Sequence, residues 1–99
     1  MDISFDGRAK KVLKSLSEEE NGRILGYIDL FSKNGFNMTS QYLKKIDNNL
    51  WELRPGNIRL LFGLVRSDAI IVNIFKKKSQ KTPIKEIKTS KKRLKEYQI

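Results

Sequence analysis

Apolar residues recur at helical spacing through the first third of the chain. In residues 9–16 they fall at positions i, i+3, i+4 and i+7, which is one face of a helix. Residues 17–20 read Ser-Glu-Glu-Glu, a capping box that begins a second helix, and an apolar face continues from there to a stop signal at Gly35. We therefore predict two short antiparallel helices whose apolar faces belong to the core.

The middle of the chain has the pattern of β-strands. Residues 50–54, 57–65 and 69–75 are rich in apolar and β-branched residues, and turn sequences separate them, Pro-Gly at 55–56 and Arg-Ser-Asp at 66–68. The last of the three is apolar at nearly every position, as expected of a central strand. These segments predict a three-stranded antiparallel meander.

Three other segments complete the predicted order. Residues 3–5 can add a short edge strand, and residues 36–48 have a weak pattern that predicts a turn of helix anchored by Tyr42, Leu43 and Ile46. Thr-Pro at 82–83 reads as an N-cap followed by proline at the first helical position. The helix that follows has one apolar face, made of Ile84, Ile87, Leu94 and Tyr97. The order β-α-α-β-β-β-α predicts an α+β fold with helices packed on an antiparallel sheet.

Composition narrows the possible functions. The 99 residues are enough for one domain, 1–99, and the chain has neither cysteine nor histidine. Disulfides, thiolate zinc sites, cysteine nucleophiles and serine–histidine triads are thereby excluded, and we expect no metal or cofactor. Its longest apolar run, at 69–72, has four residues, whereas a membrane-spanning helix needs about 20. We expect no membrane association, no signal peptide and a cytoplasmic location.

The charge is large and uneven. The chain carries +10, and residues 76–99 hold ten basic and two acidic residues, so +8 of that charge lies in the last quarter. Such clustering indicates a polyanionic partner, which could be RNA, DNA, anionic lipid or an acidic protein. The alternative is a solvated charged segment with no partner.

Arg59 is the first candidate functional residue because it interrupts an apolar strand. It shares a face with Leu61, and a two-residue loop at Pro55-Gly56 would place it opposite Glu52, with Arg54 on the same face. One interpretation is a cross-strand ion pair. The other is a guanidinium fixed on a rigid strand, whose fork matches phosphate oxygens.

Further candidates follow the sheet. Lys76, Lys77, Lys78 and Lys81 leave the last strand and could bind phosphates, or form only a solvated run. Glu52, the only acid in the predicted sheet, is a possible general base. Tyr97 is either a packing residue of the last helix or a residue that stacks on a base.

These residue types are compatible with a nuclease that needs no metal. RNA supplies its own nucleophile, the 2′-hydroxyl, so cleavage requires positioning, charge neutralisation and proton transfer. Arginine, lysine and a carboxylate or tyrosine can supply these. The sheet offers one carboxylate, too few for the two-metal site that DNA cleavage often uses.

Three segments resemble motifs of a known family. Residues 50–54 and 58–62 resemble a hairpin motif L-x-E-L-R … Y-R-x-x-Y, residues 74–83 resemble x-F-x-K-K-x-x-K-T-P, and residues 86–97 resemble E-I-x-x-A-x-x-R-x-x-E-Y. Together they are similar to the phage-derived Gp49-like branch of the RelE/ParE toxin superfamily, which includes HigB-type toxins. The resemblance covers nearly the whole chain and implies a RelE-like α+β fold.

The resemblance also implies a function. RelE- and HigB-like toxins cut mRNA in the ribosomal A site without metal, and an antitoxin, often a HigA-like helix-turn-helix protein, neutralises them. Carried over by position, Arg59 matches the strand arginine near the scissile phosphate and Arg54 matches the arginine of E-L-R. Lys76, Lys77 and Lys78 fall in the basic segment after the last strand. The expected partners are thus mRNA, the ribosome and an antitoxin.

Several positions depart from the family pattern. The RelE branch has two lysines where this chain has Leu50 and Glu52, and a tyrosine where it has Pro83 and Ile84; the histidines of HigB-type members are absent. Glu52 and Tyr97 are therefore the remaining proton-transfer candidates. Because ParE relatives share the fold and inhibit DNA gyrase, a gyrase inhibitor and a non-catalytic basic nucleic-acid-binding protein are the alternative functions.

Overall fold

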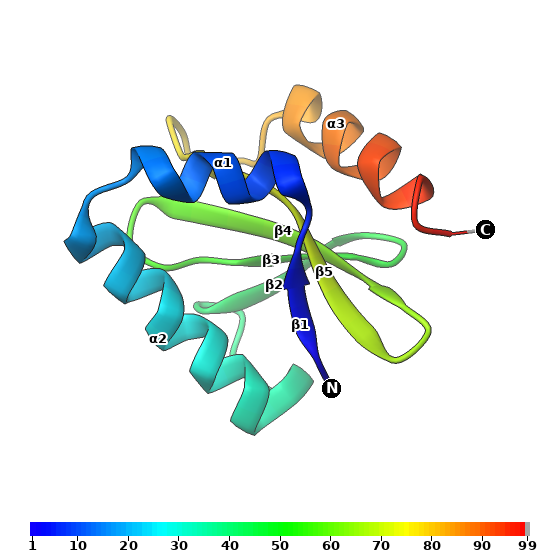
Figure 1. The fold of residues 1–99 in the computed structure, drawn as a ribbon, viewed down its shortest axis with the longest axis horizontal. Helices are drawn as coiled ribbons and strands as arrows, with labels where there is room; N and C mark the ends of the chain where they lie inside the picture. The colour runs from blue at the N-terminus through cyan, green and yellow to red at the C-terminus, as the bar shows by residue number, and fades with distance from the viewer. Residues whose placement is uncertain (99) are drawn as a thin grey trace.

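A five-stranded β-sheet forms the centre of the fold, with strand order β1-β5-β4-β3-β2. The computed structural model describes residues 1–98 (Figure 1). The elements are β1 (Ile3–Phe5), α1 (Gly7–Ser15), α2 (Glu18–Asn34), a 3-10 turn η1 (Gly35–Asn37), β2 (Leu43–Asp47), β3 (Leu50–Leu53), β4 (Ile58–Val65), β5 (Asp68–Lys76) and α3 (Ile84–Lys95). β1 pairs with β5 in parallel and all other neighbours are antiparallel. The predicted α+β class is confirmed.

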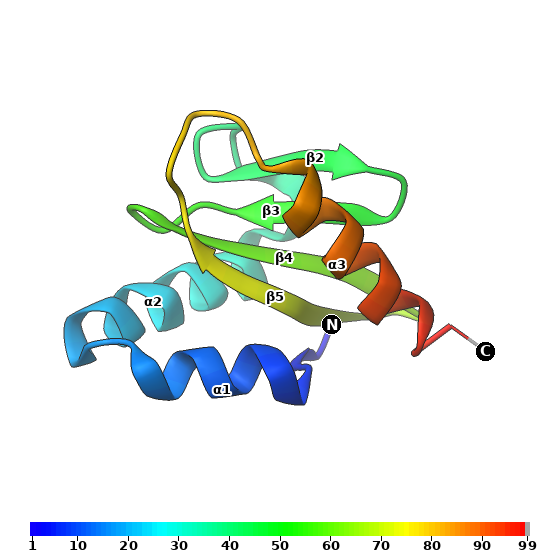
Figure 2. The ribbon, with the colours of Figure 1, turned by 90° about the horizontal axis from the view of Figure 1, so that it is seen from above.

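Helices cover both faces of the sheet. Helices α1 and α2 lie on one face and α3 on the other, as Figure 2 shows. The main core fills the space under α1 and α2, where Ile24 and Phe31 of α2 meet Leu60 and Phe62 of β4. Alternation along β4 turns Arg59, Leu61 and Gly63 to the α3 face, as predicted. No helix among residues 1–98 is long and apolar enough to cross a membrane.

The predicted start of α2 is confirmed in detail. The Ser17 hydroxyl accepts a hydrogen bond from the Glu20 N–H at 3.1 Å, and the Ser17 N–H donates to the Glu20 carboxylate at 2.9 Å. Three glutamates in this first turn also face the positive end of the helix dipole. Sequence and local geometry therefore agree at this helix.

Residues 36–48 differ from the prediction. Instead of a turn of helix anchored by Tyr42, Leu43 and Ile46, the chain forms the strand β2 along the edge of the sheet. The pairing of β2 with β3 shifts between Lys45 and Asp47, so a bulge breaks the period of two. The alternation that marks a strand is consequently short, which explains the misassignment.

Two boundaries are also shifted by one residue. The β3–β4 turn is centred on Gly56 and Asn57 rather than Pro55 and Gly56, because Gly56 adopts a φ of 60° and the Ile58 N–H donates to the Pro55 carbonyl at 3.0 Å. Glu52 therefore pairs with Leu61 and not with Arg59. The N-cap of α3 is Pro83, so the prediction of Thr82 as the cap is wrong.

Candidate nucleic-acid interface

Glu52, Arg54 and Arg59 gather at one end of the sheet, on the face that α3 covers further along. Glu52 is only 1% exposed, and its carboxylate lies 3.4 Å from Nε of Arg54 and 3.9 Å from Nε of Arg59. Moving the turn by one residue moves the pairing of β3 with β4 by two positions, from Glu52–Arg59 to Glu52–Leu61. A shift of two positions preserves the alternation, so Glu52, Arg54 and Arg59 still lie on one face of the sheet. Two guanidiniums against one carboxylate leave an excess positive charge at this end of the sheet.

Arg59 is held rigidly and is nearly buried. Its side chain donates through Nη1 to the carbonyls of Gly56 and Ile58, both at 2.8 Å, and the residue is 6% exposed. Burial lowers the pKa of Arg59 below its ordinary value, and the positive charge of Arg54 lowers this pKa further. An anionic ligand that approaches Arg54 and Arg59 would reduce the repulsion between the two guanidiniums.

Arg54 is the more accessible of the two arginines, with 21% of its side chain exposed. Its Nη1 reaches the Ser40 carbonyl at 3.5 Å, and its Nε has no hydrogen-bond partner among residues 1–98. Both arginines line an open depression of about 360 Å³, whose other lining residues are Tyr27, Gln41, Tyr42 and Gly56. Arg54 Nε is thus buried against Glu52, and the exposed part of the guanidinium faces the depression.

Tyr27 and Tyr42 were not among the residues that the sequence singled out for this site. Tyr27 belongs to α2 and Tyr42 precedes β2, so the two come from segments with no shared motif. The proximity of Tyr27 to the arginines depends on how α2 packs against the end of the β3–β4 hairpin, and that of Tyr42 on the pairing of β2 with β3. No local signal in the sequence could have indicated it.

The predicted lysines surround the same end of the sheet. Lys76 pairs with Glu20 of α2 at 3.2 Å, while Lys77, Lys78 and Lys81 are exposed in the segment 77–83 that connects β5 to α3. Figures 1 and 2 both place this segment and the β3–β4 turn at one end of the sheet. The structure thus places Lys77 and Lys81 next to Arg59.

Segment 77–83 also closes over the buried carboxylate. The Thr82 hydroxyl donates to Glu52 at 2.7 Å, and residues of the segment pack with Glu52 and Arg59 without leaving a water-sized space. Glu52 is thereby occupied by Thr82 and the two arginines. In this arrangement its carboxylate does not reach solvent.

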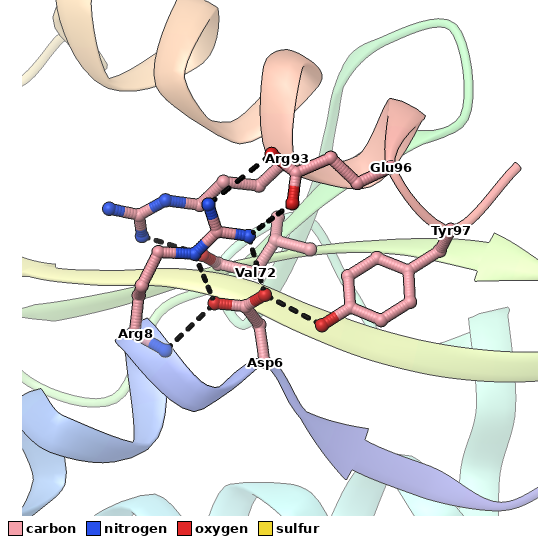
Figure 3. Close-up of polar contacts among 6 residues, drawn as sticks. All are labelled: Asp6, Arg8, Val72, Arg93, Glu96 and Tyr97. Carbon is pink, nitrogen blue, oxygen red and sulfur yellow. Dashed lines mark hydrogen bonds and ion pairs between the residues drawn. The ribbon is translucent and has the colours of Figure 1, made fainter.

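Tyr97 lies at the other end of the sheet. Its hydroxyl donates to Asp6 at 2.6 Å, and Asp6 and Glu96 together hold the guanidinium of Arg8 (Figure 3). Leu64 of β4 lines a depression together with Tyr97. It is five residue steps along the strand from Arg59, a distance of about 16 Å. The structure therefore does not bring Tyr97 together with Arg59 and Glu52.

The acidic residues are dispersed over the fold. Among residues 1–98, no group of three or more acidic side chains gathers closely enough to hold a metal ion.

Comparison with models of known protein families identifies the family of this chain. Residues 11–95 match the family model described as phage derived protein Gp49-like (DUF891). The chain belongs to the Gp49-like family. No curated protein matches the sequence of this Gp49-like protein.

The fold of the Gp49-like chain is similar to that of a solved toxin–antitoxin structure. A chain of the crystal structure of the archaeal RelE-RelB complex from Pyrococcus horikoshii OT3 superposes with a TM-score of 0.65 at 16% identity, over 81% of this chain and 97% of that one. At this identity the likeness concerns the fold. This Gp49-like protein has a RelE-like fold, and the predicted Gp49-like family is confirmed.

Proposed function

We propose that this protein is the toxin of a toxin–antitoxin pair and cleaves mRNA on the ribosome. The observation that carries the proposal is the pair Arg54 and Arg59 on one open depression, with Lys77, Lys78 and Lys81 exposed in the segment 77–83 that packs against Arg59. Family membership and the RelE-like fold agree with this function. Ribosomes are cytoplasmic, so the protein acts in the cytoplasm.

In the proposed reaction the RNA supplies the nucleophile. The 2′-hydroxyl gives up its proton as its oxygen bonds to phosphorus, the bond from phosphorus to the 5′ oxygen breaks, and that oxygen takes up a proton. The products are a 2′,3′-cyclic phosphate and a 5′-hydroxyl. No bound metal is required, because the developing charge on the phosphate is stabilised by fixed guanidiniums.

The two arginines have different parts in this proposal. Arg54, the more exposed of the two, contacts the phosphate oxygens directly, and the nearly buried Arg59 acts as a fixed positive charge beside it. Both are held by the fold before any substrate binds, so little reorganisation is needed during the reaction. The exposed lysines hold the neighbouring phosphates of the strand.

Proton transfer is the open part of the mechanism. Glu52 can take the 2′ proton only after the Thr82 hydroxyl leaves it, which requires segment 77–83 to open. Tyr97 is held by Asp6 at the far end of the sheet, so it is a weaker candidate than the sequence indicated.

The partner in this proposal is an antitoxin encoded next to the toxin. The structure with the similar fold is that of a RelE-RelB complex, and we extend that type of pairing to this chain. A HigA-like helix-turn-helix protein is the expected form. Co-purification of the two proteins, and rescue of growth by the neighbour, would test the pairing.

The decisive experiment measures mRNA cleavage by purified ribosomes carrying a defined message. Wild-type protein should cut the message in the A site, and the new ends should be a 2′,3′-cyclic or 3′-phosphate. Arg54→Ala and Arg59→Ala should each lower the rate by about 10²–10³, as expected for the loss of one transition-state contact. Arg66→Ala, an exposed arginine in the β4–β5 turn, is the matched control and should retain the rate.

Other outcomes would assign another function. Growth arrest with intact messages and broken DNA would indicate a gyrase inhibitor. Binding of nucleic acid without growth arrest would indicate a non-catalytic binding protein. Cleavage that leaves a 3′-hydroxyl would contradict attack by the 2′-hydroxyl.

A further inference from the structure

Two tyrosine rings lie beside the arginines and are in contact with each other. The ring centroids of Tyr27 and Tyr42 are 5.9 Å apart, with an interplanar angle of 58°. Both rings line the depression that Arg54 and Arg59 also line. Tyr42 is 38% exposed, so it reaches solvent beside the two arginines.

The backbone fixes the position of Tyr42 relative to Arg54. The Tyr42 N–H donates to the Thr39 carbonyl at 2.9 Å, and the Tyr42 carbonyl accepts from the Arg54 N–H at 3.0 Å. The Tyr42 ring and the Arg54 guanidinium therefore belong to two residues whose backbones are joined by a hydrogen bond. A ligand with one anionic and one flat apolar group would meet both at a fixed separation.

We propose that the ring of Tyr42 stacks on the nucleobase next to the phosphate that Arg54 binds, with Tyr27 supporting the ring from the α2 side. This inference rests on the proposed function, since it takes single-stranded RNA as the ligand. Aromatic side chains beside a basic groove are the usual means of holding unpaired bases. The depression of about 360 Å³ is within the range of ligand sites, about 300–1,000 Å³.

The arrangement favours RNA over an acidic protein as the occupant. An acidic peptide would satisfy the guanidiniums but has no requirement for an exposed ring held beside them. A nucleotide satisfies both, because its phosphate and base are covalently linked. Tyr42 is thus a substrate-positioning group that contacts the base, distinct from the arginines that contact the phosphate.

The test is a binding cycle that involves no cleavage. Four-nucleotide RNAs with 2′-O-methyl groups and a fluorescent label are titrated with the full chain at low salt, intact or lacking one base at each position in turn. With the wild-type protein, loss of one particular base should weaken binding by about 5- to 150-fold, equivalent to about 1–3 kcal/mol per stacked base. Losses at the other positions should be smaller.

Two variants assign the effect to the ring. Tyr42→Leu keeps apolar bulk but removes the ring, so it should bind intact RNA as weakly as the wild type binds the abasic RNA, and should not distinguish the two. Tyr42→Phe is the matched control and should retain the discrimination. Arg54→Ala should weaken binding of both RNAs by the same factor.

Several results would overturn the inference. The wild-type protein could bind intact and abasic RNAs equally at every position, or it could bind neither RNA. The Tyr42→Leu protein could still discriminate between intact and abasic RNA. If Tyr42→Leu does not fold, the abasic series with the wild type and Tyr42→Phe still decides whether a base is held. The binding cycle needs no ribosome, so it is independent of the cleavage assay. If the protein cleaves mRNA but does not discriminate between intact and abasic RNA, only the stacking proposal fails. If it discriminates but does not cleave mRNA, only the proposed nuclease function fails.

Discussion

The Tyr97 hydroxyl donates a hydrogen bond of 2.6 Å to the carboxylate of Asp6, 91 positions earlier in the chain. Asp6 also accepts from the Arg8 side chain at 2.8 and 3.0 Å and, as the N-cap of α1, from the Arg8 N–H at 2.9 Å. The pKa of Asp6 is lowered well below its usual range, first by the Arg8 side chain and then by Tyr97. This buried carboxylate joins the beginning of α1 to the segment after α3.

Stability should therefore depend on the charge of Asp6. Because its pKa is lower in the folded than in the unfolded state, the ionised form stabilises the fold at neutral pH, and this contribution is lost as pH falls below the ordinary value of 3.8. Asp6→Asn should lose about 1.5–3 kcal/mol at pH 7, the worth of hydrogen bonds to a charged group. Urea unfolding of both proteins from pH 7 down to about pH 2.5 should show the difference shrinking. A difference independent of pH would contradict the assignment.

Tyr97→Phe should reduce stability and spare the reaction. The substitution removes the hydrogen bond to Asp6, at a cost of about 1–3 kcal/mol, but leaves the depression at the other end of the sheet intact. Thermal unfolding and the initial rate of mRNA cleavage are the two measurements. Asp6→Asn is the control, since it weakens the same network without touching the tyrosine. A loss of rate in Tyr97→Phe alone would restore Tyr97 as a proton-transfer residue.

Glu52 should behave as an anchor for the two arginines. Glu52→Ala leaves Arg59 buried without its carboxylate and should cost about 3–5 kcal/mol, whereas Glu52→Gln keeps an acceptor for Thr82 and should cost less. The pH dependence of the cleavage rate separates anchoring from catalysis. If Glu52 moves a proton, Glu52→Gln should lose about 10²–10⁴ in rate and the acidic limb of the profile. If Glu52 only positions the two arginines, the pH profile of Glu52→Gln should keep the shape of the wild-type profile.

Close packing of α3 on β4 requires glycine at position 63. A Cβ there would lie 2.7 Å from the Asn49 carbonyl and would also meet Leu94 of α3. Gly63→Ala should therefore cost about 1–3 kcal/mol through overpacking. Gly26→Ala, in α2 with nothing near its Cβ, should stabilise the protein by about 0.5–1 kcal/mol. Equal effects in a urea titration would refute the close approach.

The lysines after β5 should determine how binding depends on salt. Replacing Lys77, Lys78 and Lys81 by alanine should flatten the plot of log affinity for ribosomes or RNA against log salt by about 0.7 for each lost phosphate contact. The matched control replaces Lys10, Lys11 and Lys14, exposed lysines of α1 that carry the same total charge. Equal flattening in both would mean that only net charge matters.

Local sequence patterns predicted much of the fold. The capping box at Ser17 and the alternation along β4 depend on neighbouring residues, so both were readable. The register of the β3–β4 hairpin was not readable from the sequence. Both Pro55-Gly56 and Gly56-Asn57 are turn signals, and the sequence alone does not choose between them. In the structure Pro55 is buried just before the turn, and Gly56 adopts the positive φ of 60° within it.

The candidate site was predictable only in part. Arg54, Arg59 and the lysines stand out because charges interrupt or follow an apolar strand. The burial of Arg59 beneath segment 77–83 and the approach of Tyr27 and Tyr42 arise from packing between distant elements. A single sequence contains no pattern for such contacts.

The parallel pairing of β1 with β5 has a consequence for the order of folding. Ile3 pairs with Ala69, so β1 has no partner in the sheet until a loop of more than sixty residues has closed. The strands β2 to β5 are joined by short turns and can assemble with far less loss of chain entropy. The first strand therefore docks late, and substitutions along its seam with β5 should accelerate unfolding while leaving the folding rate almost unchanged.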